Sequence, residues 1–166
     1  AQEGANEMAA YFRNIIRDRE RSPGKDIVSQ LLAIRNADDS LTEDEVIGTC
    51  ILFLFAGHET TTNLIGNGIR ALLKHQEQWQ LLQRQPELIG SAIEELLRYD
   101  GPTGAIVRVV AQDHEFHGRL LREGQRVFAF INAANWDPER FSQPDQLNIQ
   151  REPNRHLTFN YGKHFC

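Results

Sequence analysis

One candidate for chemistry is the run Ala-Gly-His-Glu-Thr-Thr-Thr at residues 56–62, in the middle of an apolar stretch. Thr60 follows Ala56 by one helical turn, so its hydroxyl can bond the Ala56 carbonyl, loosen the helix and free backbone groups to hold water or a small ligand. Glu59 adds a source of protons beside that hydroxyl. Because Gly inside a helix is unfavourable by about 1 kcal/mol relative to Ala, Gly57 suggests that something flat lies close to the backbone.

Two other interpretations of this run are available. A zinc-protease signature would need a second histidine at position 62, which is Thr62, and is therefore excluded. The alternative that stays open is structural: the small residues mark a crossing of two helices, and Glu59 is a buried carboxylate with partners of its own.

The two cysteines differ in their setting. Cys50 lies in the apolar stretch and is most simply an inert packing residue. Cys166 closes a loop that also contains Gly162 and His164. We therefore expect no disulfide framework, and Cys166 is the cysteine placed for chemistry.

A long helix over residues 46–73 must position the first run. Thr42 and Glu45 form a capping box, and Leu41 with Val46 forms the matching hydrophobic staple. A helix of this kind spans roughly 45 Å, longer than a small domain is wide. Residues 46–55 are apolar almost without a break, which predicts a helix that runs through the interior.

Shorter elements surround this helix. Apolar spacing and capping signals predict further helices over residues 5–18, after Asp26, around Trp79 and from Pro86 to Gly101. Strands are expected at residues 106–110, near 115–116 and at 126–130, followed by a segment that is mostly loop from residue 132.

Composition excludes several classes of protein. Of 166 residues, 40% are hydrophobic and 25% charged, as in ordinary globular proteins, and the formal net charge is -5. The net charge offers no general attraction for nucleic acid or for anionic membranes. No signal peptide and no apolar run of about 18 residues is present, so we expect a cytoplasmic protein with no membrane and no nucleic-acid partner.

Four motifs in order carry a family resemblance. They are Ala-Gly-His-Glu-Thr at 56–60, Glu-Leu-Leu-Arg at 95–98, Asn-Trp-Asp-Pro-Glu-Arg-Phe at 135–141 and the cysteine loop at 159–166. Together they resemble the cytochrome P-450 heme-thiolate monooxygenases of the soluble bacterial type. The resemblance implies a mainly α fold with a small β portion, running from the long central helix to the cysteine loop.

The resemblance covers only about the C-terminal half of a family member, so we expect the sequence to be a fragment. It predicts one partial P-450 domain over residues 1–166. Within it, residues 5–100 would be helical, residues 104–131 would hold the strands and their loop, and residues 132–166 would form the meander and cysteine loop.

The resemblance also assigns roles around heme b. Cys166 would be the axial ligand of the heme iron, and Glu59 and Thr60 would deliver protons to bound oxygen. The other expected cofactor contacts are Ala56 and Gly57 on the long helix, Arg108, His156 and His164 at the propionates, and Phe159 beneath the thiolate.

A structural role is implied for Glu95, Arg98 and Arg140, as a buried charge network that fixes the loop before the cysteine. Asn160 stands where the family usually has Gly, and Asn is the residue that best tolerates a left-handed backbone after Gly.

The implied reaction inserts one oxygen atom of O2 into a small apolar organic substrate, with electrons from NAD(P)H relayed by a ferredoxin or a flavoprotein reductase. The substrate would lie against Phe53, Gly104, Ala105 and Ile106. A peroxide-driven relative is an alternative, against which the Glu59 and Thr60 pair argues. An inactive or heme-free fragment is the other alternative.

Overall fold

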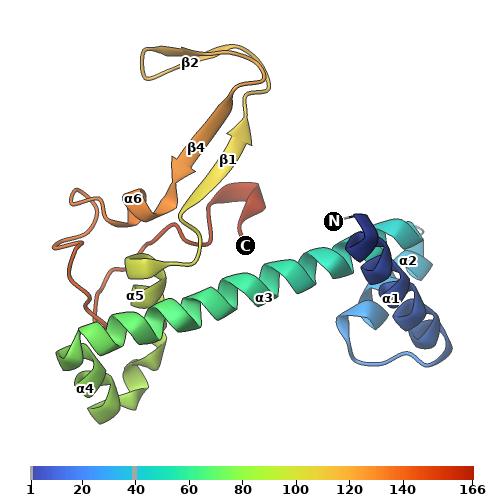
Figure 1. The fold of residues 1–166 in the computed structure, drawn as a ribbon, viewed down its shortest axis with the longest axis horizontal. Helices are drawn as coiled ribbons and strands as arrows, with labels where there is room; N and C mark the ends of the chain where they lie inside the picture. The colour runs from blue at the N-terminus through green and yellow to red at the C-terminus, as the bar shows by residue number, and fades with distance from the viewer. Residues whose placement is uncertain (1, 39–40) are drawn as a thin grey trace. The chain divides into compact units, whose positions relative to one another are not determined.

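The computed structural model describes residues 2–38 and 41–166, which divide into two compact units, residues 1–59 and 60–166. Figure 1 labels the helices α1 to α6 and the strands β1, β2 and β4. The helices are α1 (Gln2–Arg21), α2 (Ile27–Asp38), α3 (Glu43–Lys74), α4 (Gln76–Arg84), α5 (Ile89–Asp100) and α6 (Ile131–Asn135), with single 3-10 turns at Pro86–Leu88 and Gly162–His164. The strands are β1 (Ala105–Val109), β2 (His114–Phe116), β3 (Arg119–Leu121) and β4 (Arg126–Phe130). The predicted class, mainly α with a small β portion, is confirmed.

The first unit is built on α1, α2 and the beginning of α3. Asp26 caps α2, since its Oδ1 accepts a hydrogen bond from the Ser29 backbone N–H at 2.9 Å. The capping box of α3 forms as predicted: the Thr42 N–H donates to Glu45 Oε2 at 2.7 Å, and the Glu45 N–H donates to Thr42 Oγ1 at 3.2 Å. The core of this unit comprises Phe12, Ile16, Val28, Leu32, Val46, Ile47 and Cys50.

The apolar part of α3 is only partly buried. Val46, Ile47 and Cys50 are at most 4% exposed, whereas the residues from Leu52 to Phe55 are 48% to 62% exposed. The prediction that residues 46–55 run through an interior is therefore wrong for the second half of that stretch in this chain. The reason is local, because Cys50 is the last residue of α3 that belongs to the buried core of the first unit.

The second unit packs the end of α3 against α5 and the loop that follows α6. A Cβ added at Gly68 would lie 3.0 Å from Leu96 Cδ1, so glycine lets the two helices approach closely. The core of this unit comprises Ala71, Leu72, Ala92, Leu147 and Ile149.

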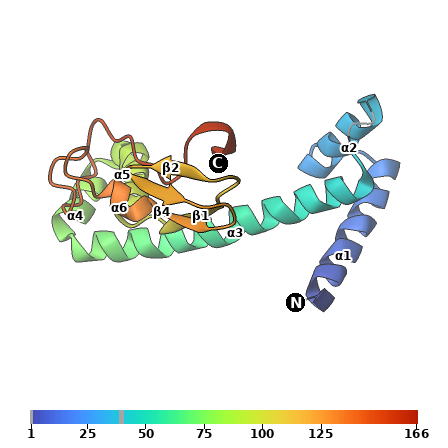
Figure 2. The same cartoon turned by 90° about the horizontal axis from the view of Figure 1, so that it is seen from above.

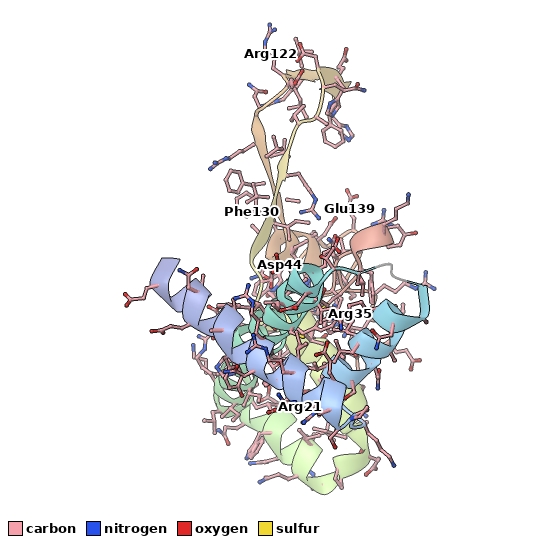
Figure 3. All side chains as sticks on the ribbon, turned by 90° about the vertical axis from the view of Figure 1, so that its right-hand side faces the viewer. Arg21, Arg35, Asp44, Arg122, Phe130 and Glu139 are labelled. Carbon is pink, nitrogen blue, oxygen red and sulfur yellow. The ribbon has the colours of Figure 1, made fainter. Side chains whose placement is uncertain are left out.

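The strands form two antiparallel pairs rather than one sheet. β1 pairs with β4, with Arg108 opposite Val127, and β2 pairs with the short β3, with His114 opposite Leu121. Figure 2 shows the same strands from above. Figure 3 labels Phe130 at the end of β4 and Arg122 directly after β3, at the top of that view. Two elements were not expected from the sequence, β3 and α6.

Candidate functional site

The cysteine loop, residues 159–166, is closed on itself by backbone hydrogen bonds. The Cys166 N–H donates to the Phe159 carbonyl at 3.0 Å, and the Phe165 N–H donates to the Gly162 carbonyl at 3.0 Å. The Asn160 N–H donates to the Leu157 carbonyl at 2.8 Å, which ties the loop to the segment before it. These bonds bring the first and last residues of the loop together.

Two residues of the loop have a left-handed backbone. Asn160 has φ 68 and Gly162 has φ 83. Asn is among the few residues other than Gly that adopt this conformation readily, so the predicted left-handed turn at Asn160 is confirmed.

The two thiols are in opposite environments. Cys50 is buried, and burial raises the pKa of its thiol, which keeps that sulfur protonated and inert. Cys166 is exposed and forms no disulfide. The sulfur available to a ligand is therefore that of Cys166.

The surroundings of Cys166 fit heme better than a metal ion held by protein alone. Among the described residues, no group of three or more His, Cys, Asp or Glu side chains could hold a metal ion. A single thiol instead suits a metal whose other positions are filled by a macrocycle. Three aromatic side chains of the loop are exposed and could pack on a flat apolar ligand: Phe159, Tyr161 and Phe165.

A buried ion pair lies on α5. Arg98 Nε donates to Glu95 Oε2 at 2.8 Å and Arg98 Nη2 donates to Glu95 Oε1 at 2.9 Å, with both side chains fully buried. Arg98 Nη1 also donates to the carbonyls of Asn135 and Pro144, both at 2.9 Å. The guanidinium thus holds the loop after α6 against α5.

The third charged member of this network is Arg151, not Arg140 as the sequence suggested. Arg151 Nε lies 3.1 Å and 3.0 Å from the two carboxylate oxygens of Glu95. Arg140 lies elsewhere, on the wall of a 390 Å³ pocket with Phe141, Arg155 and others. The prediction for Arg140 is corrected because the contact depends on the path of the loop, which brings residue 151 rather than 140 to α5.

The segment before the cysteine loop is also fastened to α5. His156 Nε2 lies 2.9 Å from Glu94 Oε2. The Thr158 hydroxyl donates to the Leu97 carbonyl at 2.7 Å, and the Asn135 amide donates to that hydroxyl at 3.0 Å. No role is predicted from the sequence for Glu94, or for Asn135 beyond its place at the start of the third motif, because no spacing pattern distinguishes either side chain from its neighbours.

The other expected propionate partners lie on two segments. Arg108 is exposed on β1, and its Nη1 donates to the neighbouring Val107 carbonyl at 2.9 Å. The His164 backbone belongs to the last 3-10 turn, while its side chain lies outside the described part of the structure. Ala105 and Ile106, expected to line a substrate pocket, are half-buried on the same strand as Arg108.

The run at residues 56–60 lies within the continuous helix α3 and is solvent-exposed. Residues 56–59 belong to the first unit, and Thr60 belongs to the second. Among the described residues, no atom outside the local helix lies within 4 Å of a Cβ placed at Gly57. Within the described part of the chain, the space beside Gly57 is therefore open.

Comparison with known proteins agrees with this geometry. A family model described as Cytochrome P450 matches residues 2–166. The chain is 46% identical over 162 residues to a biotin biosynthesis cytochrome P450 from Bacillus subtilis (strain 168), covering 98% of this chain and 41% of that relative. It is 40% identical over 161 residues to the polyketide biosynthesis cytochrome P450 PksS from the same organism, covering 96% of this chain and 40% of the relative.

Solved structures give the same result. P450BioI, crystallised with a hexadec-9Z-enoic acid ligated acyl carrier protein, matches with a TM-score of 0.90 and 46% identity over 98% of this chain and 41% of that one. The myxobacterial cytochrome P450 CYP267B1 in complex with myristic acid matches with a TM-score of 0.95 and 41% identity over 100% of this chain and 41% of that one.

The chain thus spans about 40% of the length of the relatives that it matches. No helix among the described residues has the length and apolar character that a membrane span requires. The family match runs through all four motifs, from the run at residues 56–60 to the cysteine loop. This chain belongs to the cytochrome P450 family.

Proposed function

We propose that this chain contributes the cysteine-ligand portion of a heme-thiolate monooxygenase. The reaction inserts one oxygen atom of O2 into a small apolar substrate, and NAD(P)H supplies the electrons through a ferredoxin or a flavoprotein reductase. The observation that carries the proposal is the exposed, unpaired Cys166 at the end of a loop whose ends are joined by the Cys166 N–H to Phe159 carbonyl bond of 3.0 Å.

The loop would hold the Cys166 sulfur in a defined place for heme b. Cys166 would bind the iron as its thiolate, and Phe159 would shield that sulfur from water. Arg108 and His164 would pair with the propionates, since a guanidinium and an imidazole both donate to carboxylates. When bound, heme supplies the reductive activation of O2, and the thiolate donates electron density that favours O–O cleavage.

Glu59 and Thr60 would manage protons in this reaction. A carboxyl group can hold a proton and a hydroxyl can both donate and accept one, so each of the two side chains would have a part in a short proton relay. Ala56 and Gly57 would leave the adjacent face of α3 open to a flat ligand, in agreement with the open space beside Gly57.

The substrate class follows from the same surfaces. Ala105 and Ile106 are half-buried and apolar, and we propose that they line the substrate pocket. Two related cytochromes P450 were crystallised with a fatty acid, one attached to an acyl carrier protein and one free. A small apolar compound is therefore the proposed substrate, with myristic acid as a first probe.

A pair of matched cysteine variants tests the proposal. In the full-length, heme-loaded protein, Cys166→Ser should abolish the absorption band of a thiolate-ligated carbon monoxide complex, because a neutral hydroxyl is a poor axial donor. Cys50→Ser serves as the control and should keep the band. A thiolate band that survives in Cys166→Ser would refute the assignment of the iron ligand.

A further inference from the structure

The side chain of His156 is buried, and both of its ring nitrogens have protein partners. Its side chain is 3% exposed. Nε2 lies 2.9 Å from Glu94 Oε2, and Nδ1 lies 3.3 Å from the Thr158 backbone nitrogen. The ring therefore bridges α5 and the segment that leads into the cysteine loop.

These contacts define the tautomer of the neutral ring. A backbone N–H can only donate, so His156 Nδ1 must accept from Thr158 and carries no proton. The single ring proton is then on Nε2, where it is donated to the Glu94 carboxylate. With both nitrogens in use, the ring has no donor left for a second anion.

We propose that Glu94 and His156 act as positioning residues for the cysteine loop, and that His156 is not a contact of a heme propionate. The role rests on the proposed function, because it concerns the loop that would present Cys166 to iron. It replaces the propionate role that the family resemblance suggests for this histidine.

A short series of contacts connects the pair to Cys166. The His156 ring lies 5.9 Å from the Phe159 ring, measured between centroids. The Phe159 carbonyl accepts the hydrogen bond of the Cys166 N–H. Thr158, between the two aromatic residues, is anchored separately by its hydroxyl on the Leu97 carbonyl of α5. The start of the loop is thus held at two points on one helix.

Helical geometry explains why two adjacent glutamates take different partners. Consecutive residues of an α-helix point about 100° apart, since a turn contains 3.6 residues. Glu95 is fully buried and faces Arg98 and Arg151, while Glu94 is half exposed and faces His156. One carboxylate fixes the loop after α6, and the other fixes the segment before the cysteine.

The test uses Glu94→Ala, Glu94→Gln, His156→Ala, His156→Gln and the Glu94→Ala, His156→Ala double variant of the full-length protein. Glu87→Ala is the matched control, an exposed glutamate at the start of the same helical region. Two properties are measured for each variant. The first is amide hydrogen exchange at residues 157–160, and the second is the fraction of heme that gives the thiolate carbon monoxide band.

Loss of one hydrogen bond predicts that exchange in Glu94→Ala and His156→Ala rises about two- to tenfold. Because the two residues act as one unit, the double variant should be no worse than either single variant. Glu94→Gln and His156→Gln should remain near the parent, because the glutamine oxygen can still accept and the glutamine amide can still donate. The fraction of heme that gives the thiolate carbon monoxide band should fall in the alanine variants only.

Two results would overturn the proposal. One is unchanged exchange in Glu94→Ala, and the other is loss of heme in both His156 variants with Glu94→Ala unaffected, which is the pattern of a propionate ligand. If the parent protein gives no thiolate band, the proposed function fails instead. Hydrogen exchange of the heme-free protein then still decides whether Glu94 and His156 hold the segment.

Discussion

Replacement of Arg151 by Ala tests the buried charge network most directly. The Arg151 side chain is 9% exposed, and its Nε lies within 3.1 Å of both oxygens of Glu95. Its Nη1 donates to the Ser142 carbonyl at 2.7 Å, and its Nη2 donates to the carbonyls of Gln143 and Gln146 at 3.2 Å and 3.1 Å. The substitution removes all of these bonds at once.

The expected destabilisation is about 3 kcal/mol. Removing one member of a buried ion pair generally costs about 3–5 kcal/mol, because the remaining charge is left without its partner. Glu95 keeps two bonds from Arg98, one from the Asn148 N–H at 2.9 Å and one from the Asn154 amide at 3.1 Å, so the lower end of this range applies. At a typical urea slope of about 1–3 kcal/mol per M, the unfolding midpoint should fall by roughly 1–3 M.

The assay is urea unfolding of the heme-free protein followed by far-ultraviolet circular dichroism, with midpoint and slope compared across variants. Arg140→Ala is the matched control and should change the free energy of unfolding by less than about 0.5 kcal/mol, as exposed substitutions usually do. The reverse order, with a large loss for Arg140→Ala and a small one for Arg151→Ala, would refute the reasoning and restore the assignment made from the sequence.

Three further predictions concern local features. Asn160→Val should weaken the cysteine loop by about 1–2 kcal/mol and lower heme retention, while Asn160→Gly should not, because only the latter accepts φ 68 without strain. Hydrogen bonds from the Thr42 backbone N–H and hydroxyl lower the pKa of Glu45 below its ordinary value of 4.5. The ionised Glu45 carboxylate therefore stabilises the folded state fully above pH 4.5. That contribution is lost as the pH falls through the lowered pKa. Glu45→Gln should therefore unfold at a lower temperature than the parent at pH 7 and converge with it in acid, where the parent carboxyl is also neutral. Thr60→Ala should keep heme but yield less product per NAD(P)H consumed, and unchanged coupling would remove Thr60 from the proton relay.

Local signals account for the elements that the sequence predicted well. The start of α3 follows from Thr42 and Glu45, which interact three residues apart, and the observed helix Glu43–Lys74 lies close to the predicted range of 46–73. β4 was expected at residues 126–130, where the structure has it. Features that depend only on interactions within one helical turn or one strand can be predicted without reference to the rest of the chain.

Short elements were harder to predict for a physical reason. β3 has only three residues, Arg119–Leu121, and α6 has five, Ile131–Asn135. Neither is long enough to show a hydrophobic periodicity in the sequence, so the formation of each depends on the residues that it contacts. β3 forms because it pairs with β2, and α6 lies against α5, where the Asn135 carbonyl accepts from Arg98.

The charge network shows which contacts a sequence motif can predict and which it cannot. The Glu-Leu-Leu-Arg motif correctly predicts that Glu95 and Arg98 pair, because residues three apart on a helix face each other. The partner from the loop is 56 residues from Glu95, and two arginines, Arg140 and Arg151, compete for the place. No local sequence signal distinguishes the two arginines, since both lie in a segment without regular structure.

The number of loop carbonyls that one guanidinium can bind at once decides between them. Arg151 donates to the carbonyls of Ser142, Gln143 and Gln146 while it binds Glu95. The choice of arginine is therefore a property of the folded loop, which is why the motif alone points to Arg140.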